Sequence, residues 1–289
     1  MGNTPASNPF AEFINWLLAL LGLGPKPLSM PRRVLAIVFR PGGPKYAAHS
    51  AGWHDPETLM TQYIARLNQV SGGQLTYEVT VRKAAAYFPV LADGRCYDDD
   101  SWAAARDDDT QAFRGADGAY EPVDTPRLLA DFQLVQAVAA GTLDEVWLFG
   151  GPLFGFAESC MVGQDAFPCN GPKFVADCPR FVIMGFNYER AVDEMVHDYG
   201  HRVESCLAYH YGSTTLLNAM YPDPAKYDQV PLPPNAELPA PQNDFDRFLL
   251  DHGTVHRKPG GIAYSQDVAA WLALLPADWW PCTIDPARA

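Results

Sequence analysis

Residues 34–39, Val34-Leu-Ala-Ile-Val-Phe39, form a short apolar run rich in β-branched side chains, and residues 41–44, Pro-Gly-Gly-Pro, follow it. A run of this kind, bounded by turn residues, is typical of a buried strand. A helix is expected over residues 56–70, because Asp55 can cap it and a proline stands at its first position. Residues 75–81 alternate apolar and polar side chains, which predicts a half-exposed strand. The chain therefore opens as a strand-helix-strand unit.

The rest of the chain continues this alternation. The further expected elements are a helix over 124–140, strands over 145–149 and 181–184, a long helix over 188–208 and a short helix over 244–252, with residues 92–123 and 154–179 as loops. Strands that alternate with helices in this order are typical of parallel sheets. The sequence predicts an α/β fold with a mostly parallel sheet, flanked by helices and interrupted by long irregular loop excursions.

Two regions are expected at the ends of the chain. Residues 1–30 are expected to hold an N-terminal amphipathic helix and a linker, and residues 31–289 a single α/β domain with a Pro-rich C-terminal extension. Residues 9–21 carry an apolar stripe at helical spacing, which needs a partner surface. This stripe is too short to span a bilayer, so we expect no transmembrane segment. It makes homo-oligomerisation, or docking of another partner, an open alternative.

Charge and cysteine content narrow the range of partners. The chain has 21 basic and 34 acidic residues, giving a net charge of −13, which would repel a phosphate backbone. We therefore expect no nucleic acid partner. The six cysteines include no Cys-x-x-Cys pair, so a zinc knuckle is disfavoured. Up to three disulfides, or buried free thiols, remain open, and so does the cellular compartment.

The densest cluster of chemically active side chains lies in the expected helix over 188–208. It reads Glu194-Met-Val-His197-Asp198-Tyr-Gly-His201-Arg-Val-Glu204. At about 100° per residue, Glu194, both histidines and Glu204 fall within an arc of about 80°. Two imidazoles spaced i and i+4 can reach one metal ion from a single helical face. The segment therefore predicts a metal site, with zinc or another divalent metal as its ion.

The segment His197-Asp198-Tyr-Gly-His201 resembles the His-Glu-x-x-His helix of the zincin metallopeptidases. The resemblance covers about five residues, and Asp198 stands where that family has glutamate. It implies that His197 and His201 bind zinc and that Asp198 is the general base. The spacing alone leaves the other roles open, with His256 or Glu204 as third ligand and Glu194 as ligand, as base or as a residue that orients an imidazole.

Glu158 is a further candidate, because it follows the expected strand over 145–149 and a Gly-Pro turn. Active residues of parallel α/β sheets lie beyond the carboxyl ends of the strands. Glu194, Asp198 and Glu158 are therefore the predicted catalytic residues. Their predicted function is metal-dependent hydrolysis, in which the histidine-rich helix helps to activate water. The alternative is a non-enzymatic structural or interaction protein that oligomerises or docks through its N-terminal helix.

Overall fold

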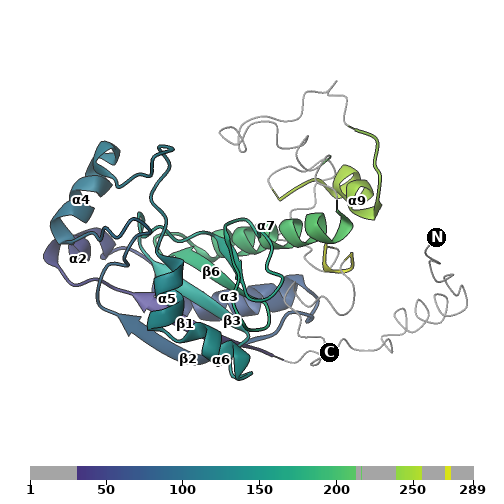
Figure 1. Cartoon of the computed structure of the whole chain (residues 1–289), viewed down its shortest axis with the longest axis horizontal. Helices are drawn as coiled ribbons and strands as arrows, with labels where there is room; N and C mark the ends of the chain where they lie inside the picture. Colours follow the sequence, from purple (N-terminus) through teal and green to yellow (C-terminus); the bar gives the residue numbers. More distant parts are fainter. Residues whose placement is uncertain (1–30, 213–215, 217–238, 256–270, 275–289) are drawn as a thin grey trace, which may run out of the picture.

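The computed structural model describes residues 31–212, 216, 239–255 and 271–274 (Figure 1). The amphipathic helix expected over residues 9–21 lies outside the described residues, as does His256. In the described part of the chain, no helix combines the length and the apolar character that crossing a membrane requires.

A six-stranded sheet forms the centre of the fold, with the strand order β2-β1-β3-β6-β4-β5. Its strands are β1 (Arg32–Phe39), β2 (Tyr77–Ala85), β3 (Glu145–Gly150), β4 (Ser159–Val162), β5 (Lys173–Phe174) and β6 (Phe181–Asn187). Strands β2, β1, β3 and β6 are mutually parallel. The expected α/β fold is therefore confirmed, and the continuous apolar runs form its central strands β1, β3 and β6.

Helices cover both faces of this sheet (Figure 1). The described helices are α2 (Pro44–Ser50), α3 (Pro56–Val70), α4 (Asp99–Asp107), α5 (Thr125–Asp131), α6 (Leu134–Ala139), α7 (Val192–Tyr211) and α9 (Asp244–His252). Of these, α2 and α4 contact each other beyond one end of the sheet, and α9 contacts α7 (Figure 1). Helices α3 and α7 contact each other, and Tyr63 of α3 packs edge-on against Trp147 and Phe186 of the sheet. Helix α3 begins as expected, because the Asp55 side chain accepts a hydrogen bond from the Thr58 amide at 3.0 Å.

Three expectations about local structure were wrong. The single helix expected over 124–140 is two helices, α5 and α6, because Gln133 adopts a left-handed conformation with φ of 56°. The loop expected over 154–179 contains β4 and β5, and β4 pairs antiparallel with β6. The loop expected over 92–123 contains α4. This helix begins with a capping box, in which the side chains of Asp98 and Ser101 each accept a hydrogen bond from the other residue's backbone amide.

A buried ion pair joins helix α7 to the sheet. Arg202 and Glu145 are 0% and 2% exposed, and Arg202 Nη1 lies 2.8 Å from Glu145 Oε1. The Trp147 indole N–H donates a second hydrogen bond to the same carboxylate oxygen at 2.9 Å. The Arg202 guanidinium also lies over the Tyr199 ring, 5.2 Å from its centroid. These contacts fix both the position and the rotation of α7 on the sheet.

Substituting Arg202 by methionine should therefore destabilise the fold strongly. The change leaves the Glu145 carboxylate buried without its counter-charge, which costs about 3–5 kcal/mol in comparable proteins. The free energy of unfolding in urea measures this loss. Arg127→Ala is the control, because it removes the exposed pair of Arg127 with Asp131 and should cost less than about 1 kcal/mol. Equal losses in the two variants would contradict the role given to Arg202.

Candidate active site

A cleft of about 470 Å³ lies at the carboxyl ends of β3 and β6. All three predicted catalytic residues, Glu158, Glu194 and Asp198, line it. The other lining residues are Tyr120, Gly151, Pro152, Leu153, Phe154, Gly155, Phe156, Gly185, Phe186, Asn187, Arg190 and Met195. The structure thus brings together carboxylates that lie up to 40 residues apart in the chain, at the edge where parallel sheets place their active sites.

Two glycines allow the loop after β3 to close one wall of this cleft. A Cβ atom at Gly185 would lie 2.4 Å from the Ala157 carbonyl oxygen, and one at Gly150 would lie 2.5 Å from the Phe154 ring. Any larger residue would push the loop away from the strand ends. Phe154 and Phe156 can therefore pack directly on the sheet and give the cleft an apolar wall opposite its carboxylates.

One acidic side chain of the cleft, Asp198, has a strongly raised pKa. Burial, together with the negative charges of Glu158 and Glu194, raises the pKa of Asp198 to about 9, and the opposing charge of Arg190 reduces this effect only in part. Asp198 is thus a neutral acid near pH 7. A carboxyl group with a raised pKa beside other acidic side chains is an arrangement that acid/base catalysis uses.

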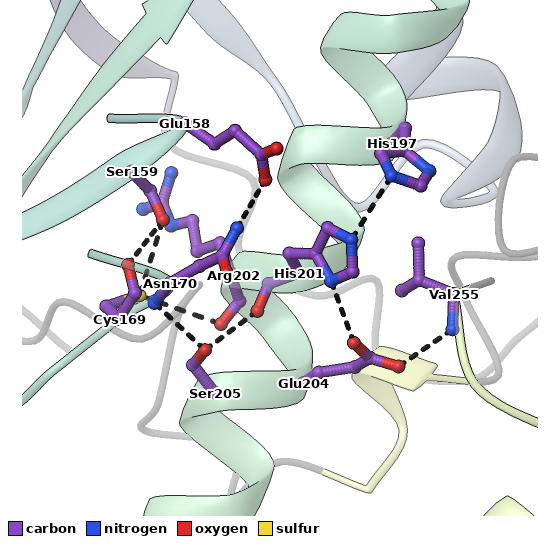
Figure 2. A network of polar contacts seen from close by, with 10 residues as sticks. All are labelled: Glu158, Ser159, Cys169, Asn170, His197, His201, Arg202, Glu204, Ser205 and Val255. Atoms are coloured by element: carbon purple, nitrogen blue, oxygen red, sulfur yellow. Dashed lines mark hydrogen bonds and ion pairs between the residues drawn. The ribbon is translucent and has the colours of Figure 1, made fainter. Parts of the chain in front are cut away.

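Glu158 is held in place from helix α7 through a neighbouring loop, as Figure 2 shows. The Asn170 side-chain amide donates a hydrogen bond to Glu158 Oε2, and the Asn170 backbone amide donates to Ser205 Oγ at 3.1 Å. Ser205 in turn donates to the His201 carbonyl oxygen at 2.9 Å. This chain of contacts couples the cleft carboxylate to the turn of α7 that carries His201. The sequence did not predict that Asn170 and Ser205 position Glu158, because no periodic pattern marks a contact between a loop and a helix.

The two histidines of α7 point their Nε2 atoms toward each other. These atoms lie 3.1 Å apart, and the ring planes are perpendicular. On the other side of the His201 ring, Nδ1 lies 3.0 Å from Glu204 Oε2. Burial alone would lower the pKa of His201, but the hydrogen bond and charge of Glu204, with the charge of Glu158, raise it overall.

Glu204 is buried, with 3% of its surface exposed. Its second carboxylate oxygen, Oε1, accepts a hydrogen bond at 2.7 Å from the backbone amide of Val255 (Figure 2). The helical spacing that groups Glu194 to Glu204 on one face does not predict what covers that face. In the structure, residues 253–255 cover the Glu204 end of that face. The Glu204 carboxylate therefore lies behind His201, where it can orient the imidazole.

Among the described residues, no group of three or more His, Cys, Asp or Glu side chains has an arrangement that suits a metal ion. His197 and His201 supply two converging nitrogens. His256, one of the two residues predicted as third ligand, follows Val255 directly in the sequence and lies outside the described residues.

Comparisons of the chain with models of protein families, with curated proteins and with solved structures found no match.

The raised pKa of Asp198 predicts a pH dependence of stability. In the folded chain Asp198 keeps its proton up to about pH 9, whereas an unfolded aspartate loses it near pH 4. Between these values the folded state binds one more proton, so stability falls as pH rises, by up to about 1.4 kcal/mol per pH unit. Asp198→Asn should remove most of this slope. Urea unfolding of metal-free protein from pH 5 to 8, with EDTA present, measures it.

Asp193→Asn is the matched control, because it neutralises an exposed carboxylate in the first turn of the same helix. This variant should keep the pH slope of the wild type. The assigned protonation state is wrong if Asp198→Asn also keeps that slope.

Proposed function

We propose that the protein is a metal-dependent hydrolase, with zinc held by helix α7 beside the cleft at the ends of β3 and β6. His197 and His201 are not among the residues that line this cleft, but His197 directly precedes Asp198, which does line it. The convergence of His197 Nε2 and His201 Nε2, 3.1 Å apart on one face of α7, carries this proposal. Two nitrogens bound to one tetrahedral zinc ion at 2.0–2.1 Å would lie about 3.3 Å apart. The pair is thus already close to the separation that zinc requires.

The surroundings of His201 support the same proposal. Histidines that bind a metal usually donate their other ring N–H to a carboxylate, which fixes the tautomer and the orientation of the ring. Glu204 is in this position at Nδ1 of His201. We therefore assign His197 and His201 as ligands, Glu204 as the positioning residue and His256 as the third ligand. When bound, zinc would polarise a substrate carbonyl and lower the pKa of a water molecule.

The cleft supplies the acid and base groups. Asp198, with its raised pKa, can donate a proton to a leaving group, whereas Glu158 and Glu194 can accept one from water. Phe154 and Phe156 add an apolar surface on which the apolar part of a substrate could pack. Three acidic side chains against the single Arg190 disfavour phosphate esters, so we propose an uncharged or cationic amide, ester or glycoside as substrate.

The alternative function, a non-enzymatic protein that docks or oligomerises through its N-terminal helix, depends on residues 9–21. These residues lie outside the described part of the chain, and the alternative stays a prediction.

Metal binding is the first test. Purified wild-type protein should bind one zinc ion per chain, measured by elemental analysis and by titration against a chelating dye. His197→Ala and His201→Ala should abolish this binding, because each removes one of two converging ligands. Glu204→Gln should weaken it roughly 10–100-fold, the usual cost of losing such a positioning carboxylate.

His210→Ala is the control for this experiment, since His210 is an exposed histidine in the last turn of the same helix. This variant should bind zinc like the wild type. Failure of the wild type to bind zinc, or equal binding by His201→Ala, would refute the metal site.

Hydrolysis is the second test, with chromogenic amide, ester and glycoside substrates. Asp198→Asn should lower kcat by roughly 10²–10⁴ while zinc content is unchanged, because the substitution removes the proton donor and keeps both ligands. Asp193→Asn is again the matched control and should keep wild-type activity. If the zinc-loaded protein hydrolyses none of these substrates, the metal site would stand but the proposed hydrolase activity would be contradicted.

A further inference from the structure

Cys169 lies against helix α7 in a completely buried position. Its Sγ atom lies 3.7 Å from the Arg202 carbonyl oxygen and 3.8 Å from Ser159 Oγ. Ser159 also donates a hydrogen bond to the Cys169 carbonyl oxygen at 2.6 Å, which fixes the backbone of this residue. The loop between β4 and β5 is therefore held against α7 at Cys169, next to Asn170 (Figure 2).

Cys206 is one helical turn beyond Arg202 and is also completely buried. Side chains in a helix lean toward its N-terminus, so Cys206 covers the turn that begins at the Arg202 carbonyl. The two side chains are therefore directed to the same carbonyl group, and both are free thiols in the structure. Hydrogen bonding to Cys206 lowers the pKa of the Cys169 thiol. Burial raises this pKa, but the positive charge of Arg202 also lowers it, and the overall shift is downward.

The other described cysteines are less well placed to pair with Cys169. Cys160 is the neighbour of Ser159 in β4, and successive side chains of a strand point to opposite faces. Because Ser159 faces Cys169, Cys160 faces away from it. Cys178 and Cys96 lie in other loops, where Cys96 Sγ donates to the Phe88 carbonyl at 3.2 Å.

We propose that Cys169 and Cys206 form a disulfide when the chain folds in the presence of a low-molecular-weight disulfide such as glutathione disulfide. The thiolate of Cys169 attacks this disulfide, forms a mixed disulfide and releases one thiolate. The thiolate of Cys206 then attacks Sγ of Cys169 and releases the second. Overall, two cysteine thiols lose two electrons and two protons, and one small disulfide becomes two small thiols.

The exchange takes place during folding, because both thiols are buried in the folded chain and a bulky oxidant cannot reach them there. The disulfide would bond the β4-β5 loop covalently to α7. It would thereby hold Asn170 against Ser205 and keep Glu158 in position. This inference does not depend on the proposed hydrolase activity.

The test is to refold the reduced full-length chain with glutathione disulfide and, in parallel, with dithiothreitol. Peptide mapping by mass spectrometry without reduction should find the Cys169 peptide linked to the Cys206 peptide. Thiol titration in denaturant should find four free thiols in the oxidised sample, against the six cysteines of the sequence. The oxidised sample should have a Tm higher by about 5 °C, because the bond constrains the unfolded chain.

Alanine variants of single cysteines distinguish the Cys169–Cys206 disulfide from other cysteine pairings. Cys169→Ala and Cys206→Ala should each lose the linked peptide and the Tm difference between oxidised and reduced samples, whereas Cys178→Ala should keep both. The wild-type peptide map tests the proposal even if a variant fails to fold. Six free thiols after oxidative refolding would overturn it, as would a linkage of Cys169 to Cys160 or to Cys282.

Discussion

The buried ion pair between Arg202 and Glu145 is the contact on which the arrangement of α7 depends. Its two charges are removed from water, which is costly unless each is matched by an opposite charge and by hydrogen bonds. Trp147 donates a hydrogen bond to the Glu145 carboxylate, and the Tyr199 ring lies against the Arg202 guanidinium. Because a helix is rigid, fixing one side chain in the sheet fixes the direction of all others. Asp198 and Cys206 lie four residues to either side of Arg202, on the same row of the helix. The pair therefore aims Asp198 at the cleft and Cys206 at Cys169.

The neighbouring row of α7 has a different environment. His197, His201 and Ser205 follow one another at intervals of four, and Glu204 stands beside them. The β4-β5 loop contacts this face at Ser205, and residues 253–255 contact it at Glu204. Two segments far apart in the chain thus close on opposite sides of the histidine pair. A polar helical face in water would have no need of such contacts. Here its side chains are held in fixed directions, as a binding or catalytic site requires.

Much of the fold follows from local sequence patterns, whereas the surroundings of the site do not. Continuous apolar runs are sufficient to identify β1, β3 and β6, since these strands are buried on both faces. Strands β4 and β5 are too short for a period to be recognised, and no glycine or proline marks the break at Gln133. The helical spacing groups Glu204 with the two histidines on a polar face and assigns no role to Arg202. The partners of Arg202 and Glu204, which are Glu145 and Val255, are 57 and 51 residues away, and a pattern within one helix contains no information about them.

The tautomer of His201 connects its surroundings to its proposed role. The Glu204 carboxylate can only accept, so a hydrogen bond at 3.0 Å assigns the proton of neutral His201 to Nδ1. The lone pair of His201 is then on Nε2, directed at His197 Nε2. In this neutral state and without a metal, the 3.1 Å contact needs a proton from His197 Nε2. If a metal were bound, the Nε2 lone pair of His201 would serve as one ligand, and His197 would need its other tautomer to supply the second. In the proposed site, metal binding would therefore require the transfer of one proton on His197 and no change in helix α7.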